Sequence, residues 1–187
     1  NKKCIFIVKN LYIIKHQNGG RTVMDLNGIS KNKVLVSLIV LAVLTRLIPH
    51  PPNIAPITGI ALFGGSRFNN KWIGFGLPLL CMFISDLFLG FSSITMFVYL
   101  SFMMISYIGI NSKTITNGTI LGSSLLFFLL TNLGVFLLGY PHTIQGLITC
   151  YTLALPFLVN TIIGDLFFTH SLSYSFEKVK QLGVVRG

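Results

Sequence analysis

Apolar segments separated by short polar connections fill the chain from about residue 34 to residue 168. A helix needs about 20 predominantly apolar residues to cross a bilayer, and several of these segments approach that length. The pattern predicts six helical segments over about residues 34–48, 56–66, 72–91, 94–110, 120–138 and 144–168. We therefore predict an all-α polytopic membrane bundle of six transmembrane segments, with a short or broken second segment.

The stretch around this second segment is the most unusual part of the sequence. Residues 46–67 read RLIPHPPNIAPITGIALFGGSR, in which closely spaced prolines predict an extended, non-helical backbone before Pro56. The apolar run after Pro56 covers only ~15–20 Å at ~1.5 Å per residue, against a hydrocarbon core of ~30 Å. Short, broken helices of this kind often form substrate sites in transporters. A plain loop followed by a short, tilted helix is the alternative interpretation.

Composition supports a membrane protein. Hydrophobic residues make up 52% of the chain and charged residues only 10%, whereas a soluble domain carries about 25% charged residues. The net charge is +10, but half of the Lys and Arg residues precede residue 34, and the rest are scattered without an aromatic-rich basic face. We therefore expect the lipid bilayer, and no nucleic acid, as a partner.

The positions of the basic residues predict an orientation. With the N-terminus in the cytoplasm, 13 of the 14 Lys and Arg residues fall on the cytoplasmic side, and the outer connections 49–55, 90–94 and 139–143 hold none. This bias predicts cytoplasmic N- and C-termini. It divides the chain into a cytoplasmic N-terminal segment (1–32), a six-helix membrane domain (33–169) and a cytoplasmic tail (170–187). Met24 is a candidate start, so residues 1–23 are open to interpretation as non-native.

Polar residues inside the predicted spans are the candidate functional residues, because such groups are costly in lipid and usually face a cavity or another helix. Those predicted near the outer end form our candidate substrate-binding set: Arg46, His50, Asn53, Asp86, Asn132, Tyr140 and His142. Arg46 and Asp86 are expected to pair, either as a structural ion pair or while contacting a ligand. The positive end of the short helix, at Pro56 to Thr58, is expected to face an anionic substrate group. Asp165 is predicted near the inner end, as a candidate for proton coupling.

Two spans show a similar pattern. A Leu-Pro pair at 77–78 precedes Asp86, and a second pair at 155–156 precedes Asp165, with proline-to-aspartate spacings of eight and nine residues. These are the third and sixth predicted spans, which is the arrangement of an inverted repeat. Chance similarity between apolar segments is the alternative explanation.

The sequence predicts no enzyme, no cofactor and no metal site. It contains no HExxH, CxxC or GxSxG motif and no phosphate-binding glycine loop. A catalytic dyad of Asp86 and Asp165 would need the two carboxyl groups within a few Å, but their predicted depths differ by ~15–20 Å at ~1.5 Å per residue.

Several motifs carry a resemblance to known proteins. The motifs are RLIPHPPN followed by Pro56, ALFGG at 61–65, SDLFLGF at 85–91, VYLSF at 98–102, TNLGV at 131–135 and GDLFFT at 164–169. They resemble an uncharacterised family of small bacterial integral membrane proteins, from about Lys33 to Thr169. This resemblance implies the bacterial inner (cytoplasmic) membrane, and it carries no established activity.

The layout is also similar to the substrate-binding (S) components of energy-coupling-factor vitamin transporters. That resemblance implies an outward-opening pocket for a vitamin- or cofactor-like substrate, and partners comprising a transmembrane scaffold and ATPases. S components usually dock the scaffold through an alanine-x-x-x-alanine-like face on the first helix, but here the first span offers only Ser37 and Ala42, five residues apart. A solitary transporter therefore stays open.

From these patterns we expect a small-molecule uptake protein of the S-component type. Two alternatives remain: a non-transporting accessory or scaffold subunit, and a proton-coupled carrier that uses Asp165. An enclosed, partly polar pocket near Arg46 favours uptake, whereas polar groups paired with one another around no cavity favour a scaffold.

Overall fold

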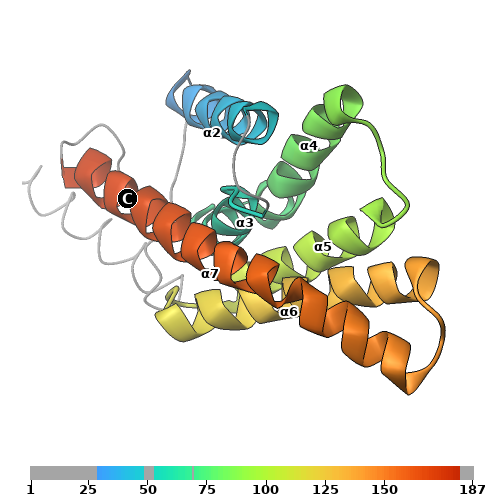
Figure 1. The fold of residues 1–187 in the computed structure, drawn as a ribbon. Coiled ribbons are helices and arrows are strands. Elements are labelled where there is room, and N and C mark those ends of the chain that lie inside the picture. The colour runs from blue at the N-terminus through green and yellow to red at the C-terminus, as the bar shows by residue number, and fades with distance from the viewer. Residues whose placement is uncertain (1–28, 49–52, 69, 182–187) are drawn as a thin grey trace, which may run out of the picture.

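A computed structural model describes residues 29–48, 53–68 and 70–181 of the chain. Six helices make up most of these residues (Figure 1), and the described chain is all-helical. Their bounds are α2 (Ile29–Leu47), α3 (Ile57–Arg67), α4 (Lys71–Leu89), α5 (Thr95–Asn111), α6 (Asn117–Gly139) and α7 (Ile144–Gln181). The sequence-based segments agree with the first five helices to within a few residues, and the predicted short second segment is the 11-residue α3.

The last helix is longer than predicted. Helix α7 has 38 residues and continues to Gln181, although the sequence analysis ended this segment at about residue 168. Phe176 explains the extension, because its buried ring packs at 5.6 Å from the Phe63 ring of α3, between centroids, and lies 5.3 Å from the Arg67 guanidinium carbon. Leu172, one turn earlier, packs against the same core. An apolar stripe in a mostly polar segment therefore keeps the chain helical.

Helix α3 forms the centre of the molecule. All residues from Ile57 to Ser66 are buried, and α3 packs against α4, α5 and α7 (Figure 1). Around it, α5 packs on α6, α6 packs on α7, and α2 packs on α4. A short helix at depth is tolerated when protein surrounds it, which is the arrangement found here.

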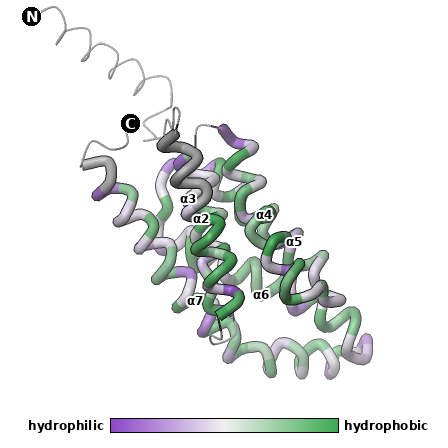
Figure 2. The backbone as a smooth tube through the Cα atoms, turned by 90° about the horizontal axis from the view of Figure 1, so that it is seen from above, coloured by the Kyte–Doolittle hydropathy of each residue, from purple (hydrophilic) through white to green (hydrophobic). Residues whose placement is uncertain are grey.

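The surrounding helices turn large hydrophobic side chains outward. Leu87, Phe88, Leu121 and Phe167 are among the exposed residues, and Figure 2 shows hydrophobic positions along the helices. Three described helical stretches are long and apolar enough to cross a membrane: Lys71–Leu89, Asn117–Gly139 and Ile144–Lys178. The six crossings and the cytoplasmic termini remain predictions.

Glycines set the distance between α3 and its neighbours. A Cβ at Gly74 of α4 would lie 2.6 Å from the Gly64 carbonyl oxygen, and one at Gly109 of α5 would lie 2.8 Å from the Leu62 carbonyl oxygen. A Cβ at Gly65 would lie 2.7 Å from the Ile110 backbone nitrogen. These obstacles are backbone atoms, so any side chain would force the helices apart. Helices α3, α4 and α5 are therefore in direct backbone contact at this end of α3.

Candidate functional site

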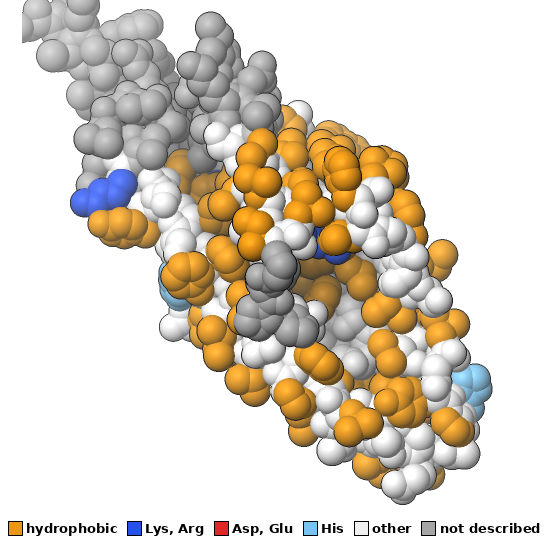
Figure 3. Space-filling view, turned by 45° about the horizontal axis from the view of Figure 1, so that its top comes forward, with side chains coloured by type: hydrophobic (Ala, Val, Ile, Leu, Met, Phe, Trp, Pro, Cys, Tyr) orange, Lys and Arg blue, Asp and Glu red, His pale blue; other side chains and the backbone are white. Residues whose placement is uncertain are grey.

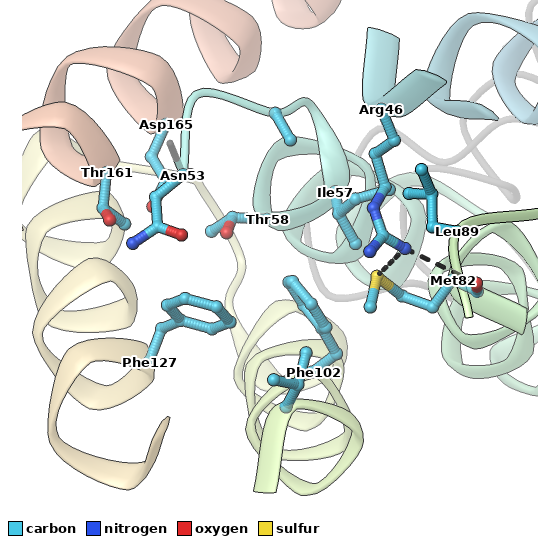
Figure 4. A pocket seen from close by; sticks show the side chains of 12 residues that line it. Arg46, Asn53, Ile57, Thr58, Met82, Leu89, Phe102, Phe127, Thr161 and Asp165 are labelled. Atoms are coloured by element: carbon cyan, nitrogen blue, oxygen red, sulfur yellow. Dashed lines mark hydrogen bonds between the residues drawn. The ribbon is translucent and has the colours of Figure 1, made fainter. Parts of the chain in front are cut away.

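A cavity of about 280 Å³ lies at the opposite, N-terminal end of α3. Figure 3 shows a hollow in a surface made largely of hydrophobic side chains, and Figure 4 shows the cavity from close by. Every described helix and the segment before α3 contribute to the wall. The lining residues are Arg46, Asn53, Ala55, Ile57, Thr58, Met82, Leu89, Val98, Phe102, Phe127, Thr161 and Asp165.

Arg46 of α2 forms the basic side of the cavity. Its Nη1 atom lies 2.9 Å from Oδ1 of Asp86 and donates to the Ser85 hydroxyl and, at 3.1 Å, to the Met82 sulfur. A guanidinium carries five N–H donors on three nitrogens. Within the described residues, every hydrogen bond and ion pair of Arg46 uses Nη1, so the donors on Nε and Nη2 are available to a bound molecule.

Asp86 of α4 fixes Arg46 in place. The residue is 5% exposed, and its second carboxylate oxygen accepts a hydrogen bond from the Tyr99 hydroxyl at 3.0 Å. The ion pair considered from the sequence is thus present, supported by a third helix. Asp86 is not among the residues that line the cavity, and it touches the cavity wall only through Arg46.

Asp165 of α7 forms the acidic side of the cavity. It is only 1% exposed, and its Oδ2 atom lies 2.6 Å from the Ser124 hydroxyl of α6, with Thr58 of α3 as a further hydrogen-bonding neighbour. Within the described residues no Lys or Arg forms an ion pair with Asp165. This buried carboxylate therefore has hydroxyl partners and no cationic one.

Asp165 and Arg46 share one cavity. The sequence analysis placed Asp165 near the inner end and Arg46 near the outer end, and it did not foresee that both residues line the same cavity. Two observations account for this: α7 extends well beyond Asp165, and α3 begins inside the molecule at a buried Pro56. Position along a sequence gives depth only when each helix starts at the membrane surface.

The N-terminus of α3 also differs from its predicted role. We expected its positive end to face an anionic group of the substrate, but the protein's own Asp165 carboxylate lies beside Thr58. The backbones are close here, because a Cβ at Gly164 would lie 3.1 Å from the Ile54 Cα atom. The helix end carries roughly half a positive charge, so it offsets part of the carboxylate charge.

Aromatic side chains separate the two charged sides. In Figure 4, Phe102 of α5 and Phe127 of α6 lie below the space between Arg46 and Asp165, and their ring centroids are 5.2 Å apart. Ile57 faces the same space. The cavity thus has a basic side, an apolar middle and an acidic side.

Asn53 lies beside the acidic side and has an unusual backbone. Its φ is 66°, in the left-handed region that asparagine tolerates better than most residues. In Figure 4 its amide points into the cavity near Thr161 and Asp165. The backbone conformation thus directs a polar side chain towards the acidic side.

A second cavity of about 330 Å³ adjoins the first and shares Asn53, Val98 and Phe127 with it. Two further residues of the candidate set, Asn132 and Tyr140, line this second cavity. The Asn132 amide donates to the Phe128 carbonyl at 2.8 Å. Arg46, Asn53, Asn132 and Tyr140 are therefore the four candidate residues that line one or both of these cavities.

His142 lies away from both cavities. His142 is exposed, its Nε2 atom lies 3.0 Å from the Leu137 carbonyl oxygen, and its ring packs against Phe136. It lines neither cavity. His50 lies outside the described residues, as do most of the residues of the predicted N-terminal segment.

The sequence analysis expected Thr58 only as part of the helix end, and it missed Thr161 and the two phenylalanines of the cavity wall. One signal was available: Thr161 and Asp165 are four residues apart, which places them on one face of a helix. The phenylalanines carry no such signal, because apolar positions in a membrane segment are equally typical of packing.

The described structure defines a class: a helical protein with helices that could span a membrane and a partly polar cavity that is open at the surface. The chain belongs to DUF6580, a family of unknown function, whose family model matches residues 27–184. Neither a search of curated proteins nor a search of solved structures found a match. Membership of an uncharacterised family is thereby confirmed, and the similarity to S components remains an expectation from the sequence.

Proposed function

We propose that this protein is a membrane-embedded uptake protein that binds a small polar molecule in the cavity between Arg46 and Asp165. The observation that carries the proposal is the cavity itself, which has an ionisable residue on each side inside an otherwise apolar helical protein. Charged residues within membrane segments are costly and usually mark substrate or ion sites.

The arrangement of the charges favours this function over a scaffold role. A purely structural network would use up its charges internally, as Asp86 does. Arg46 keeps donors for the cavity, and Asp165 keeps an uncompensated carboxylate. The volume of about 280 Å³ is at the lower limit of the ~300–1,000 Å³ typical of ligand sites, so the ligand is small.

The remaining features of the proposal follow the sequence analysis. Six crossings and cytoplasmic termini would open the cavity to the outside, and a movement of helices would later expose it inward. An S-component mode would add an energising transmembrane scaffold and ATPases as partners, and the bilayer in question would be the bacterial inner membrane.

A second candidate, a proton-coupled carrier, is supported by Asp165. The Ser124 hydroxyl is 2.6 Å from Asp165 and also 3.1 Å from the Ile120 carbonyl, but it has one proton to donate. A proton on Asp165 would allow Asp165 to donate to Ser124 while Ser124 donates to Ile120. Substrate-dependent acidification of proteoliposomes, lost in Asp165→Asn, would support this carrier, and uptake without proton movement would exclude it.

The uptake proposal is tested by filling the cavity. A thermal-shift screen of the purified full chain against vitamins, their precursors and metal ions identifies binders. Val98→Phe introduces a larger side chain into a wall shared by both cavities, whereas Leu100→Phe changes an exposed position of the same helix. We expect every binder to lose its shift in Val98→Phe and to keep it in Leu100→Phe, with matching losses of uptake. Binding that survives Val98→Phe would overturn the proposal.

A further inference from the structure

The acidic side of the cavity has the chemistry that suits a positively charged group with several N–H donors. Asp165 offers a buried carboxylate whose charge no described Lys or Arg neutralises. Removing such a charge from water is costly unless a cation or a proton compensates it. The helix end of α3 supplies only roughly half a charge, which leaves room for a further cation.

The neighbours of Asp165 add acceptors at the same place. The Thr161 hydroxyl donates its proton to the Phe157 carbonyl at 2.8 Å, so the oxygen has only lone pairs to offer the cavity. The Asn53 amide lies on the same side, with its nitrogen towards Thr161 and its carbonyl oxygen towards Thr58, and a flip of the amide exchanges the two (Figure 4). An ammonium group has three N–H donors, which these three acceptors can match.

The basic side has the opposite preference. The Nε and Nη2 groups of Arg46 offer donors and no acceptor, in a planar arrangement that suits a carboxylate. Asp86, Ser85 and Met82 hold Nη1 and thereby orient the guanidinium. Charge-assisted pairs between arginine and a carboxylate are among the stronger hydrogen bonds in proteins.

The middle of the cavity determines where the two charges of a ligand must lie. Phe102, Phe127 and Ile57 line the space between Arg46 and Asp165 and provide no charged group (Figure 4). A ligand with both charges on one carbon could satisfy only one side. A ligand with a flat apolar body and one charge at each end satisfies both.

From this arrangement we infer that the ligand is a bipolar zwitterion, with an ammonium group held by Asp165, Thr161 and Asn53, a carboxylate held by Arg46, and a flat apolar body between them. This inference rests on the proposed function, because it names the substrate class of the same cavity. It is narrower than that function, since a neutral or singly charged ligand would also be taken up through a cavity.

The test uses four related probes with the purified full chain: 4-(aminomethyl)benzoate, 4-methylbenzoate, 4-methylbenzylamine and phenylalanine. The first has both charges at opposite ends of a ring, the next two lack one charge each, and phenylalanine has both charges on one carbon. We expect 4-(aminomethyl)benzoate to bind about tenfold more tightly than each of the others, as measured by calorimetry. Equal affinities, or no binding of this probe at millimolar concentrations, would overturn the inference.

Two variants locate the ammonium site. Asp165→Asn should abolish the preference for 4-(aminomethyl)benzoate over 4-methylbenzoate, and retained binding of 4-methylbenzoate shows that the variant is folded. Asn53→Gly tolerates the left-handed backbone and removes the side-chain amide. It should lower the affinity for 4-(aminomethyl)benzoate about threefold to tenfold. If Asp165→Asn still bound 4-(aminomethyl)benzoate more tightly than 4-methylbenzoate, by the same factor as the unmodified protein, Asp165 would not hold the ammonium group.

The two proposals fail in different ways. Suppose that a screening hit no longer binds in Val98→Phe, but the protein binds 4-(aminomethyl)benzoate no more tightly than the other probes. Uptake through the cavity then stands, and the inferred zwitterion is wrong. If Val98→Phe has no effect on any binder, the cavity itself is not the site.

Discussion

Asp86 and Asp165 are both buried carboxyl groups, but their charged neighbours differ. Both are buried, and each accepts a hydrogen bond from a hydroxyl of another helix: Tyr99 of α5 for Asp86 and Ser124 of α6 for Asp165. Asp86 also faces Arg46 at 2.9 Å, whereas Asp165 has no cationic partner within the described residues. The comparison places Asp86 in a structural ion pair, and it supports the proposal that Asp165 is kept for a bound cation or proton.

The largest effect is expected when Asp86 loses its partner. Arg46→Met leaves a carboxylate that is 5% exposed with only the Tyr99 hydroxyl, and removal of one member of a buried pair costs about 3–5 kcal/mol. Equilibrium unfolding of the purified protein in mixed micelles measures this loss. A stability equal to that of the unmodified protein would show that the pair is not structural.

The double variant Arg46→Met with Asp86→Asn should recover part of this loss. Removing both charges leaves no uncompensated carboxylate, so we expect a coupling of about 2 kcal/mol between the two sites. The same unfolding measurement on both single variants and the double variant completes the cycle. Additive losses would mean that the 2.9 Å contact contributes little.

Removing each hydroxyl in a separate variant compares the two hydrogen bonds directly. Tyr99→Phe removes a hydrogen bond to a charged group and should cost about 1.5 kcal/mol. Ser124→Ala should cost about 1 kcal/mol or less, because the Ser124 hydroxyl shares its one proton between Asp165 and the Ile120 carbonyl. The difference in unfolding free energy between the two variants is the quantity to measure. A larger loss for Ser124→Ala would mean that the hydrogen bond to Asp165 contributes more than the one to Asp86.

The smallest and most diagnostic change is Asp165→Asn. The amide keeps the shape and can still accept the Ser124 hydroxyl while it removes an uncompensated acid, so ligand-free stability should be unchanged or rise by up to about 1 kcal/mol. Asp86→Asn is the matched control, and it should be destabilising because Arg46 loses its counter-charge. A comparable loss in both variants would mean that Asp165 is compensated in the empty protein.

The sequence predicted the helices well because apolar runs and polar breaks report them directly. The 11-residue α3 follows from the prolines before it and from the polar residues after it. The extension of α7 was missed, because Leu172 and Phe176 are isolated apolar residues in a polar segment. Their importance depends on Phe63 and Arg67, which are far away in the sequence.

The site was predicted only in part, for a related reason. The Arg46–Asp86 pair follows from opposite charges predicted at the same depth. The position of Asp165 could not be predicted in this way. It depends on how deep in the molecule α3 begins and on the contact between Gly164 and Ile54. Glycine contacts of this kind set how helices cross, and a sequence shows the glycines without showing their partners.

The backbone contacts of Gly65, Gly74 and Gly109 have a consequence for how a guest molecule enters and leaves. Carbonyl and amide atoms lie so close to these glycines that α3, α4 and α5 pack backbone against backbone, and any side chain there would push them apart. Helix α2 packs on α4 and brings Arg46 to the cavity, where the ion pair with Asp86 holds it. Under the proposed function, a movement of α2 that opens the cavity would therefore have to break the Arg46–Asp86 ion pair.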